Sequence, residues 1–169
     1  TGVLLKHYGI KTPLSSFNSY NQVKKSDRLI ARLAAGHDLA LVSDAGTPGV
    51  SDPLYYLVKA VLDQRVPVVS LPGPSAVLAA LTVSGLPINR FVFEGFLPRK
   101  KGRKKLIEEL AQEKRTIVLF ESPHRIVKTL NELYQVMGDR KAVLARELTK
   151  IHEEVIRGTL GTLATKAEE

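Results

Sequence analysis

Apolar and polar residues follow two distinct patterns along this chain. Short apolar runs that end in β-branched or aromatic residues are typical of buried strands, whereas apolar positions three and four residues apart are typical of amphipathic helices. The first pattern predicts strands at residues 39–43, 66–71, 91–96, 116–120, 142–146 and 154–157. Helices are predicted at residues 26–35, 53–64, 77–83, around 106–110, at 123–137 and from 160 to the end. This succession of strands and helices predicts an α/β fold.

The stretch Ser84-Gly85-Leu86-Pro87 interrupts the pattern with residues that favour turns. We therefore expect two domains, residues 1–86 and residues 87–169. In the first domain, the strands at 39–43 and 66–71 each lead through a loop rich in glycine and proline into a helix. This order predicts a β-α-β-α unit with parallel strands and right-handed crossovers.

The loop after the first of these strands, residues 42–53, carries polar chemistry. Asp44 directly follows the strand, so we expect its carboxylate at the edge of the sheet, where open α/β sheets bind ligands. Gly46 and Gly49 permit positive φ and a close approach of a ligand to the backbone. The dipeptide Asp52-Pro53 suits the start of a helix. An ordinary turn with a capped helix is therefore the alternative to a binding site.

The strand at 66–71 ends in a second loop, Pro72-Gly73-Pro74-Ser75-Ala76. Pro74 suits a helix start, and the free N–H groups of Ser75 and Ala76 are predicted to point toward the same edge as Asp44. The apolar helix that follows, residues 77–83, reads as core packing. Its first turn is the ligand candidate.

Composition narrows the possible functions. The chain of 169 residues is long enough for one large domain or two small ones, and it contains no cysteine, which excludes a disulfide framework and thiolate chemistry. Its four histidines show no paired ligand spacing, so we predict no metal site. No apolar stretch approaches the roughly 18 residues of a membrane span, and no signal-peptide pattern is present. We expect a soluble, cytoplasmic protein.

Positive charge is concentrated in one short segment. Six basic residues occupy positions 99–105 and account for most of the formal net charge of +8. They are Arg99, Lys100, Lys101, Arg103, Lys104 and Lys105. Such a patch suits contact with a polyanion such as RNA. A solvated basic loop is the alternative.

Five stretches of the sequence, in this order, resemble the tetrapyrrole-methylase superfamily. They are SDAGTPGVSDP (43–53), PGPSA (72–76), FEGFLP (93–98), FESPHR (120–125) and RELTK (146–150). Within the superfamily they are most similar to the bacterial members that methylate small-subunit ribosomal RNA. The resemblance implies a class III S-adenosylmethionine methyltransferase with a parallel-sheet N-terminal domain, a mixed-sheet C-terminal domain and the cofactor in the cleft between them. It also implies a homodimer.

The resemblance carries over to individual positions. It implies that the cofactor is bound by Asp44, Ala45, Gly46, Thr47, Ser75, Ala76, Phe120 and Glu121. The implied reaction is methylation of the ribose 2′-hydroxyl of a cytidine in 16S ribosomal RNA, with the 30S subunit as partner. The six basic residues named above, together with Arg125, fit the RNA side. The family also has a strand and a Pro-x-Gly loop ahead of residue 1 and further elements after residue 169, so we expect this chain to be part of a longer protein.

Transfer of a methyl group needs alignment of the two reactants more than covalent help. A base that takes the proton of the ribose hydroxyl would assist. Glu121, His124 and Lys150 are the candidates, because each follows a strand of the second domain. The alternatives are an ion pair between Glu121 and Arg125, four residues on, an exposed His124 and an ordinary surface lysine at 150. Asp44 is expected to hold the ligand rather than to act as a base.

Two other functions stay open at this point. A related member of the superfamily would methylate a small tetrapyrrole, which the basic patch and the FESPHR stretch disfavour. The chain could also be a non-catalytic RNA-binding domain that keeps the fold. Calorimetry with S-adenosylmethionine distinguishes the second possibility, because a binding-only domain would give no heat.

Overall fold

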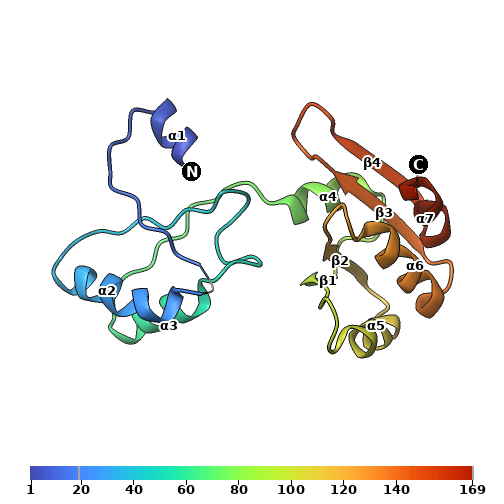
Figure 1. Ribbon diagram of the computed structural model, residues 1–169, viewed down its shortest axis with the longest axis horizontal. Helices are drawn as coiled ribbons and strands as arrows, with labels where there is room; N and C mark the ends of the chain where they lie inside the picture. Colours follow the sequence, from blue (N-terminus) through green and yellow to red (C-terminus); the bar gives the residue numbers. More distant parts are fainter. Residues whose placement is uncertain (19, 169) are drawn as a thin grey trace. The chain divides into compact units, whose positions relative to one another are not determined.

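The computed structural model describes residues 1–18 and 20–168 (Figure 1). The chain divides into two compact units, Thr1–Ser75 and Ala76–Glu169, and each is described by itself. The domain boundary expected after Leu86 stays a prediction. Residue 169, the expected end of the second domain and of its last helix, lies outside the described residues.

The first unit is built on three helices: α1 (Gly2–His7), α2 (Gln22–Ala34) and α3 (Tyr55–Asp63). Helices α2 and α3 pack against each other. Leu57 and Val61 of α3 are buried, as is Ser26 of α2, whose hydroxyl donates a hydrogen bond to the Gln22 carbonyl at 2.6 Å. The helices expected at 26–35 and 53–64 are therefore confirmed, with small shifts of their ends.

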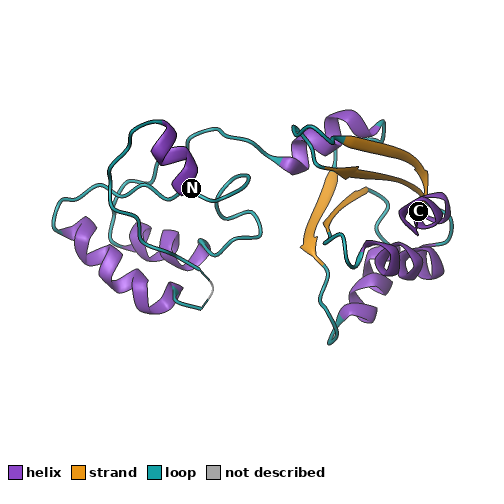
Figure 2. Ribbon diagram, turned by 45° about the horizontal axis from the view of Figure 1, so that its top comes forward, coloured by secondary structure: helices purple, strands orange, loops and turns teal. Residues whose placement is uncertain are grey.

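The parallel sheet expected in this unit is not formed, and that prediction is wrong for the described residues. Residues 39–43 and 66–71 run as loops in Figure 2, and no strand occurs in the described part of this unit. Val42 and Val69 are exposed. A strand is stable when a neighbour accepts and donates its backbone hydrogen bonds. Neither run pairs with the other or with another described segment, so apolar sequence alone does not make them strands.

The second unit contains the strands, coloured orange in Figure 2, and confirms the α/β class. Its elements are α4 (Ala76–Ser84), β1 (Phe91–Phe96), α5 (Arg103–Ala111), β2 (Thr116–Phe120), α6 (Ile126–Met137), β3 (Lys141–Arg146), β4 (Glu154–Thr159) and α7 (Leu160–Glu168). Strands β1 and β2 pair in parallel, and α5 connects them. Strands β3 and β4 pair antiparallel, with Arg146 opposite Glu154. These are two sheets of two strands each among the described residues.

One apolar core holds this unit together. Its buried members come from α5, α6, α7 and the segment after β1, and they are Leu97, Ile107, Leu110, Leu130, Leu133, Leu160, Leu163 and Ala164. Helix α6 packs on α5 and α7, and α7 packs on the β3–β4 pair (Figure 1). The helical periodicity of the sequence predicts the inward positions of α5 and α6 among them, because apolar residues three and four apart share one helix face.

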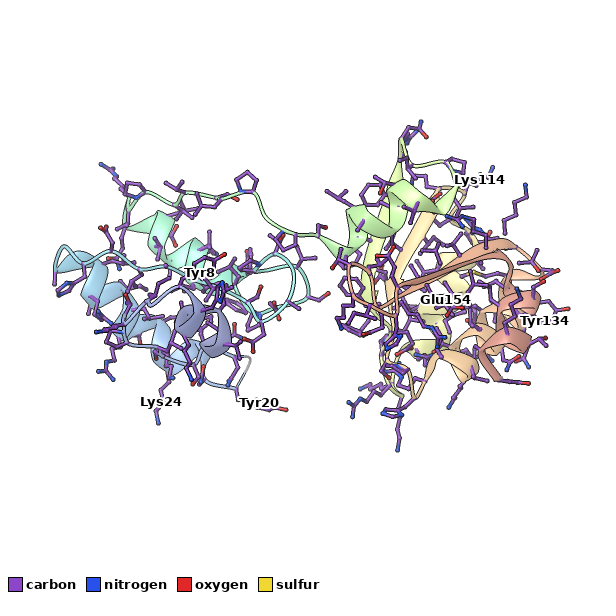
Figure 3. The ribbon with its side chains drawn as sticks, turned by 90° about the horizontal axis from the view of Figure 1, so that it is seen from above. Tyr8, Tyr20, Lys24, Lys114, Tyr134 and Glu154 are labelled. Carbon is purple, nitrogen blue, oxygen red and sulfur yellow. The ribbon has the colours of Figure 1, made fainter. Side chains whose placement is uncertain are left out.

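Two details of α6 differ from expectation. The helix begins at Ile126 rather than Pro123, because residues 122–125 form a turn closed by a 3.0 Å hydrogen bond from the Arg125 N–H to the Ser122 carbonyl. Tyr134 continues the apolar periodicity of this helix, which predicts an inward position, but it lies exposed at the edge of the unit (Figure 3). Its ring lies against Gly161 of α7, where a Cβ atom would be 3.3 Å from the ring. The absence of a side chain at this position lets the ring rest on α7.

No helix in the described part of the chain has the length and apolar character needed to cross a membrane.

The C-terminal end of helix α4 is attached to β4 within the second unit. There, Nε of Arg157 in β4 donates a 3.0 Å hydrogen bond to the Val83 carbonyl.

Candidate functional site

The carboxylate of Asp44 projects from the first loop and accepts two hydrogen bonds. Its side chain is 86% exposed. One oxygen, Oδ1, accepts hydrogen bonds from the Thr1 ammonium and from the Thr1 hydroxyl, each at 2.6 Å. These bonds, the one from the ammonium first, lower the pKa of Asp44. An exposed carboxylate of this kind can accept hydrogen bonds from a ligand.

The loop around Asp44 is shaped by its own backbone. The Ser43 hydroxyl donates a 2.8 Å hydrogen bond to the Gly46 carbonyl, and Gly46 adopts a φ of 69°. A Cβ atom at Gly46 would meet nothing within 4 Å, so the backbone of Ala45 and Gly46 is open to an approaching group. The cap expected from Asp52-Pro53 does not form, because α3 begins two residues later with Leu54 at its N-cap.

The side chain of Thr47 joins the two loops of the first unit. The Thr47 hydroxyl donates a 2.9 Å hydrogen bond to the carbonyl of Pro74, 27 residues away. The sequence predicted the two loops on one rim of a sheet. Although the sheet is not formed, this bond brings the first loop to the residue directly before Ser75. Ser75 closes the first unit, and Ala76 is the first residue of α4 in the second.

An open cavity of about 550 Å³ lies beside the first loop, between Pro48-Gly49 and α3. It is lined largely by apolar side chains of α3, such as Tyr55 and Val58. Neither Asp44 nor Ser75 lines it. The cavity is therefore separate from the residues predicted to hold a cofactor.

In the second unit, Phe120 and Glu121 stand at the carboxyl end of β2. The ring of Phe120 contacts Phe93 edge-on, with ring centres 5.0 Å apart, and Phe96 at 5.4 Å. Phe120 is half-buried in this cluster. Carboxyl ends of parallel strands are the usual ligand edge of such sheets. The position of Phe120 therefore suits contact with a ligand.

The Glu121 side chain is only 5% exposed and both of its oxygens are engaged. Oε1 accepts the Ser122 N–H at 2.8 Å. Oε2 accepts the Thr129 hydroxyl at 2.7 Å and lies 3.1 Å from Nη2 of Arg125. The ion pair with Arg125, considered as the alternative role of Glu121, is present. These contacts make the side chain a structural anchor at the start of α6.

Arg103 is the clearest correction to the predicted basic patch. Its side chain was expected to face RNA, but the residue is 7% exposed. Its Nε lies 2.6 Å from Glu132 Oε2, its Nη2 donates to the Thr129 hydroxyl at 2.7 Å, and its Nη1 donates to the Pro98 carbonyl at 3.1 Å. A guanidinium can be buried when every donor has an acceptor of this kind. Arg103 therefore fastens α5 to α6 and is not a surface cation.

The other five basic residues of this segment are exposed: Arg99, Lys100, Lys101, Lys104 and Lys105. Lys104 and Lys105 pair loosely with Glu108 and Glu109, four residues on, at 3.9 and 3.6 Å. Arg125 is partly buried and donates to the Leu97 carbonyl at 3.0 Å. Within residues 99–105, the exposed cations that form no ion pair are therefore Arg99, Lys100 and Lys101.

The remaining catalytic candidates differ in how they are engaged. The Lys150 ammonium lies 3.0 and 3.1 Å from the two carboxylate oxygens of Glu147. His124 is exposed, in the turn before α6, and makes no hydrogen bond or ion pair within the described residues. The described residues include no group of three or more acidic or histidine side chains able to hold a metal ion.

Sequence reasoning missed the buried network around Arg103. Its partners Thr129 and Glu132 lie three residues apart, which places them on one face of α6. A threonine and a glutamate at this spacing were the available signal, but the same pattern is common on exposed helices. Phe96 lies in the FEGFLP stretch, and the sequence alone gives no sign of a role for its ring.

Comparison with known proteins defines the class. Residues 4–164 match the family described as Tetrapyrrole (Corrin/Porphyrin) Methylases, and the chain belongs to that family. Over 164 residues it is 50% identical to a protein of Synechocystis sp. named Ribosomal RNA small subunit methyltransferase I, and over 168 residues 51% identical to the protein of that name in Xylella fastidiosa. The alignments cover 96% and 98% of this chain but 59% and 62% of those relatives. The chain thus spans about six tenths of their length.

Solved structures agree on the fold. Uroporphyrin-III C-methyl transferase from Thermus thermophilus, complexed with S-adenyl homocysteine, matches with a TM-score of 0.62 at 22% identity, over 97% of this chain and 75% of that one. A cobalamin biosynthetic enzyme, cobalt precorrin-4 methyltransferase, matches with a TM-score of 0.60 at 21% identity, over 85% of this chain and 63% of that one. At this identity the likeness concerns the fold alone.

Proposed function

We propose that this chain is part of an S-adenosylmethionine-dependent methyltransferase that acts on small-subunit ribosomal RNA. The proposal is supported by relatives that are 43–51% identical to this chain and share the name Ribosomal RNA small subunit methyltransferase I. The structural observation that carries the proposal is the hydrogen bond from Thr47 to the Pro74 carbonyl. Through this bond the two loops that the family resemblance assigns to the cofactor are neighbours, although they are far apart in the sequence.

The residues present fit such a cofactor by their chemistry. The cofactor offers ribose hydroxyls and an α-ammonium, which are O–H and N–H donors, and the exposed carboxylate of Asp44 can accept hydrogen bonds of both kinds. Ala45, Gly46 and Thr47 would contribute backbone groups in the first unit, and Ser75 and Ala76 would contribute from the end of the second loop. Phe120 and Glu121 would contribute from the end of β2, Glu121 through its backbone because its side-chain oxygens are engaged.

The proposal extends to the ribose 2′-hydroxyl of a cytidine as the methyl acceptor. The cofactor, when bound, supplies a methyl group carried on a sulfonium sulfur. Of the three candidate bases, His124 suits the proton of the ribose hydroxyl, since an exposed imidazole nitrogen can accept it. Lys150 is held by Glu147, and the oxygens of Glu121 already accept hydrogen bonds.

The RNA side of the proposal rests on Arg99, Lys100 and Lys101. These exposed cations can contact phosphates, whereas Arg103 is buried and paired. Phosphate contacts make binding weaken with salt, and each contact adds about 0.7 to the slope of log affinity against log salt for single strands. We include a homodimer, which the resemblance implies, and a cytoplasmic location, which suits a ribosomal RNA substrate. Light scattering of the purified chain tests the dimer.

Calorimetry with S-adenosylmethionine is the first test. We expect binding to the unsubstituted chain and a loss of about tenfold or more in Asp44→Asn, because a charge-assisted hydrogen bond contributes roughly 1.5–3 kcal/mol. Asp52→Asn is the matched control, since Asp52 is an exposed carboxylate of the same loop. Equal affinities of the two variants would contradict the assignment of Asp44.

Methyl transfer is the second test. The chain is incubated with labelled cofactor and either 30S subunits or a tetrapyrrole, and resistance of the RNA to alkaline cleavage locates a 2′-O-methyl group. Label in RNA alone supports the proposal. Label in the tetrapyrrole would favour the other branch of the family, and cofactor-independent RNA binding without label in either would leave an RNA-binding domain.

A further inference from the structure

The strand β1 contains a bulge that changes the direction of its last side chain. Phe93 pairs with Val118, but the next paired residue is Gly95, opposite Leu119, so Glu94 is extra. Gly95 takes a φ of 71°, which suits a glycine. In a regular strand, side chains three residues apart lie on opposite faces. Here Phe93 and Phe96 both contact the ring of Phe120, so the bulge has brought Phe96 to the same face.

Despite this contact, Phe96 is 55% exposed. It stands opposite Phe120, with the two rings tilted by 54° and their centres 5.4 Å apart. Both residues lie at the carboxyl ends of the parallel strands β1 and β2. A large apolar ring left open at this edge contributes little to the core, and bulges that re-aim a side chain are frequent beside functional sites.

The backbone that follows Phe96 is held firmly. Leu97 is 2% exposed, and its carbonyl accepts a 3.0 Å hydrogen bond from Arg125. The next carbonyl, that of Pro98, accepts a 3.1 Å hydrogen bond from Arg103. Two guanidinium groups therefore anchor the two residues after the ring. Phe96 is presented by a fixed segment, and such pre-organisation reduces the entropy lost on binding.

Exposed cations come next in the chain. Arg99, Lys100 and Lys101 begin three residues after Phe96, so the Cα atoms of Phe96 and Arg99 are at most about 11 Å apart. An exposed aromatic ring beside cations is the combination that binds single-stranded nucleic acid, in which bases stack on rings and phosphates contact basic side chains. The adjacent cations favour a polyanion over a neutral apolar partner.

We propose that the exposed ring of Phe96 is a stacking platform for one nucleobase of a single-stranded RNA segment whose phosphates contact residues 99–101. This proposal rests on the proposed function, since it takes RNA as the ligand, and it adds the mode of recognition. Stacking on a ring tolerates any base, because every base has a π face. The platform therefore contributes affinity and positions the RNA strand, while other residues would select the nucleotide.

The test measures binding of a labelled, unstructured oligoribonucleotide by fluorescence anisotropy. Phe96→Ala is expected to weaken binding roughly tenfold, the effect typical of losing one stacked base. Phe96→Tyr keeps the ring and should bind within about twofold of the unsubstituted chain. Tyr20→Ala removes an aromatic ring that projects freely from the first unit (Figure 3) and should change nothing.

Two further comparisons separate stacking from other effects. The salt dependence of Phe96→Ala should match that of the unsubstituted chain, whereas Lys100→Ser with Lys101→Ser should flatten it. An oligoribonucleotide with abasic sites should bind Phe96→Ala and the unsubstituted chain alike. If Phe96→Ala fails to fold by circular dichroism, Phe96→Leu decides, because leucine fills similar space without a π face.

Three results would overturn the proposal. The first is unchanged RNA affinity in folded Phe96→Ala or Phe96→Leu, which leaves the proposed function intact. The second is a loss of S-adenosylmethionine affinity with RNA affinity unchanged, which would assign the ring to the adenine of the cofactor. The third is failure of the unsubstituted chain to bind RNA, which overturns the proposed function as well.

Discussion

Replacing Arg103 by methionine tests whether the buried network supports the fold of the second unit. The guanidinium contacts Glu132 at 2.6 Å, the Thr129 hydroxyl at 2.7 Å and the Pro98 carbonyl at 3.1 Å, and it lies 3.8 Å from Glu121. Removing one partner of a buried ion pair costs roughly 3–5 kcal/mol. Arg125 remains beside Glu121 and the Glu132 side chain is 31% exposed, so we expect about 3 kcal/mol, near the lower end of that range.

The measurement is urea denaturation followed by circular dichroism at 222 nm, a wavelength that reports helix. A loss of about 3 kcal/mol lowers the midpoint by at least about 1 M urea. Lys104→Met is the matched control: it removes the same charge one position along, from a side chain that is 88% exposed and 3.9 Å from Glu108. An exposed pair at this spacing contributes about 0.5 kcal/mol or less. Arg103→Lys should fall between the two, because an ammonium lacks the planar fork that reaches several acceptors.

The same variants distinguish a structural arginine from an RNA contact. Arg103→Met should leave the salt dependence of RNA binding unchanged under conditions where it is folded, whereas Lys101→Met should lower the slope by about 0.7. The reasoning is refuted if Arg103→Met and Lys104→Met have equal free energies of unfolding. It is also refuted if Arg103→Met alters the salt slope as much as Lys101→Met does.

Three other predictions follow from single positions. Gly49 has a φ of 88°, and a Cβ atom there would lie 2.8 Å from Cδ2 of Leu54, so Gly49→Ala should lower the free energy of unfolding by roughly 1–2 kcal/mol in urea titrations; an unchanged midpoint would contradict the positive φ. The hydrogen bonds from Arg115 lower the pKa of Glu113 from 4.5 to about 2, so the stability from this pair is present above pH 4.5 and is lost as the pH falls toward 2. An NMR titration should find the pKa of Glu113 higher in Arg115→Met than in the unsubstituted chain, because the guanidinium bonds are lost while the backbone N–H bond remains, and equal values in both proteins would count against the pairing. If His124 takes the proton of the ribose hydroxyl, His124→Gln should lower kcat about a hundredfold or more while cofactor affinity in calorimetry stays the same, and a kcat within threefold of the original would remove His124 from the mechanism.

In the second unit, the observed strands and helices agree closely with those predicted from the sequence. The strands predicted at 91–96 and 116–120 have those bounds in β1 and β2, and the inward positions of α5 and α6 include Ile107, Leu110 and Leu130. These features depend on local periodicity, because side chains repeat every two residues in a strand and every 3.6 in a helix. The first unit shows the limit of that reasoning: the run at 39–43 has the composition of a strand but no described segment pairs with it.

For the candidate site, the sequence by itself determined where loops rich in glycine, proline and acidic residues interrupt the pattern, and it placed Asp44 in an exposed loop. Tertiary structure decided which of the basic side chains are exposed and able to contact a ligand. Arg103 has the same charge as its neighbours in the sequence, yet it is buried because α5 packs on α6 and brings Thr129 and Glu132 to it. Likewise, Phe96 faces Phe120 because a bulge arises where β1 pairs with β2. Burial and side-chain direction at these positions depend on pairing between segments distant in sequence, which local propensities do not encode.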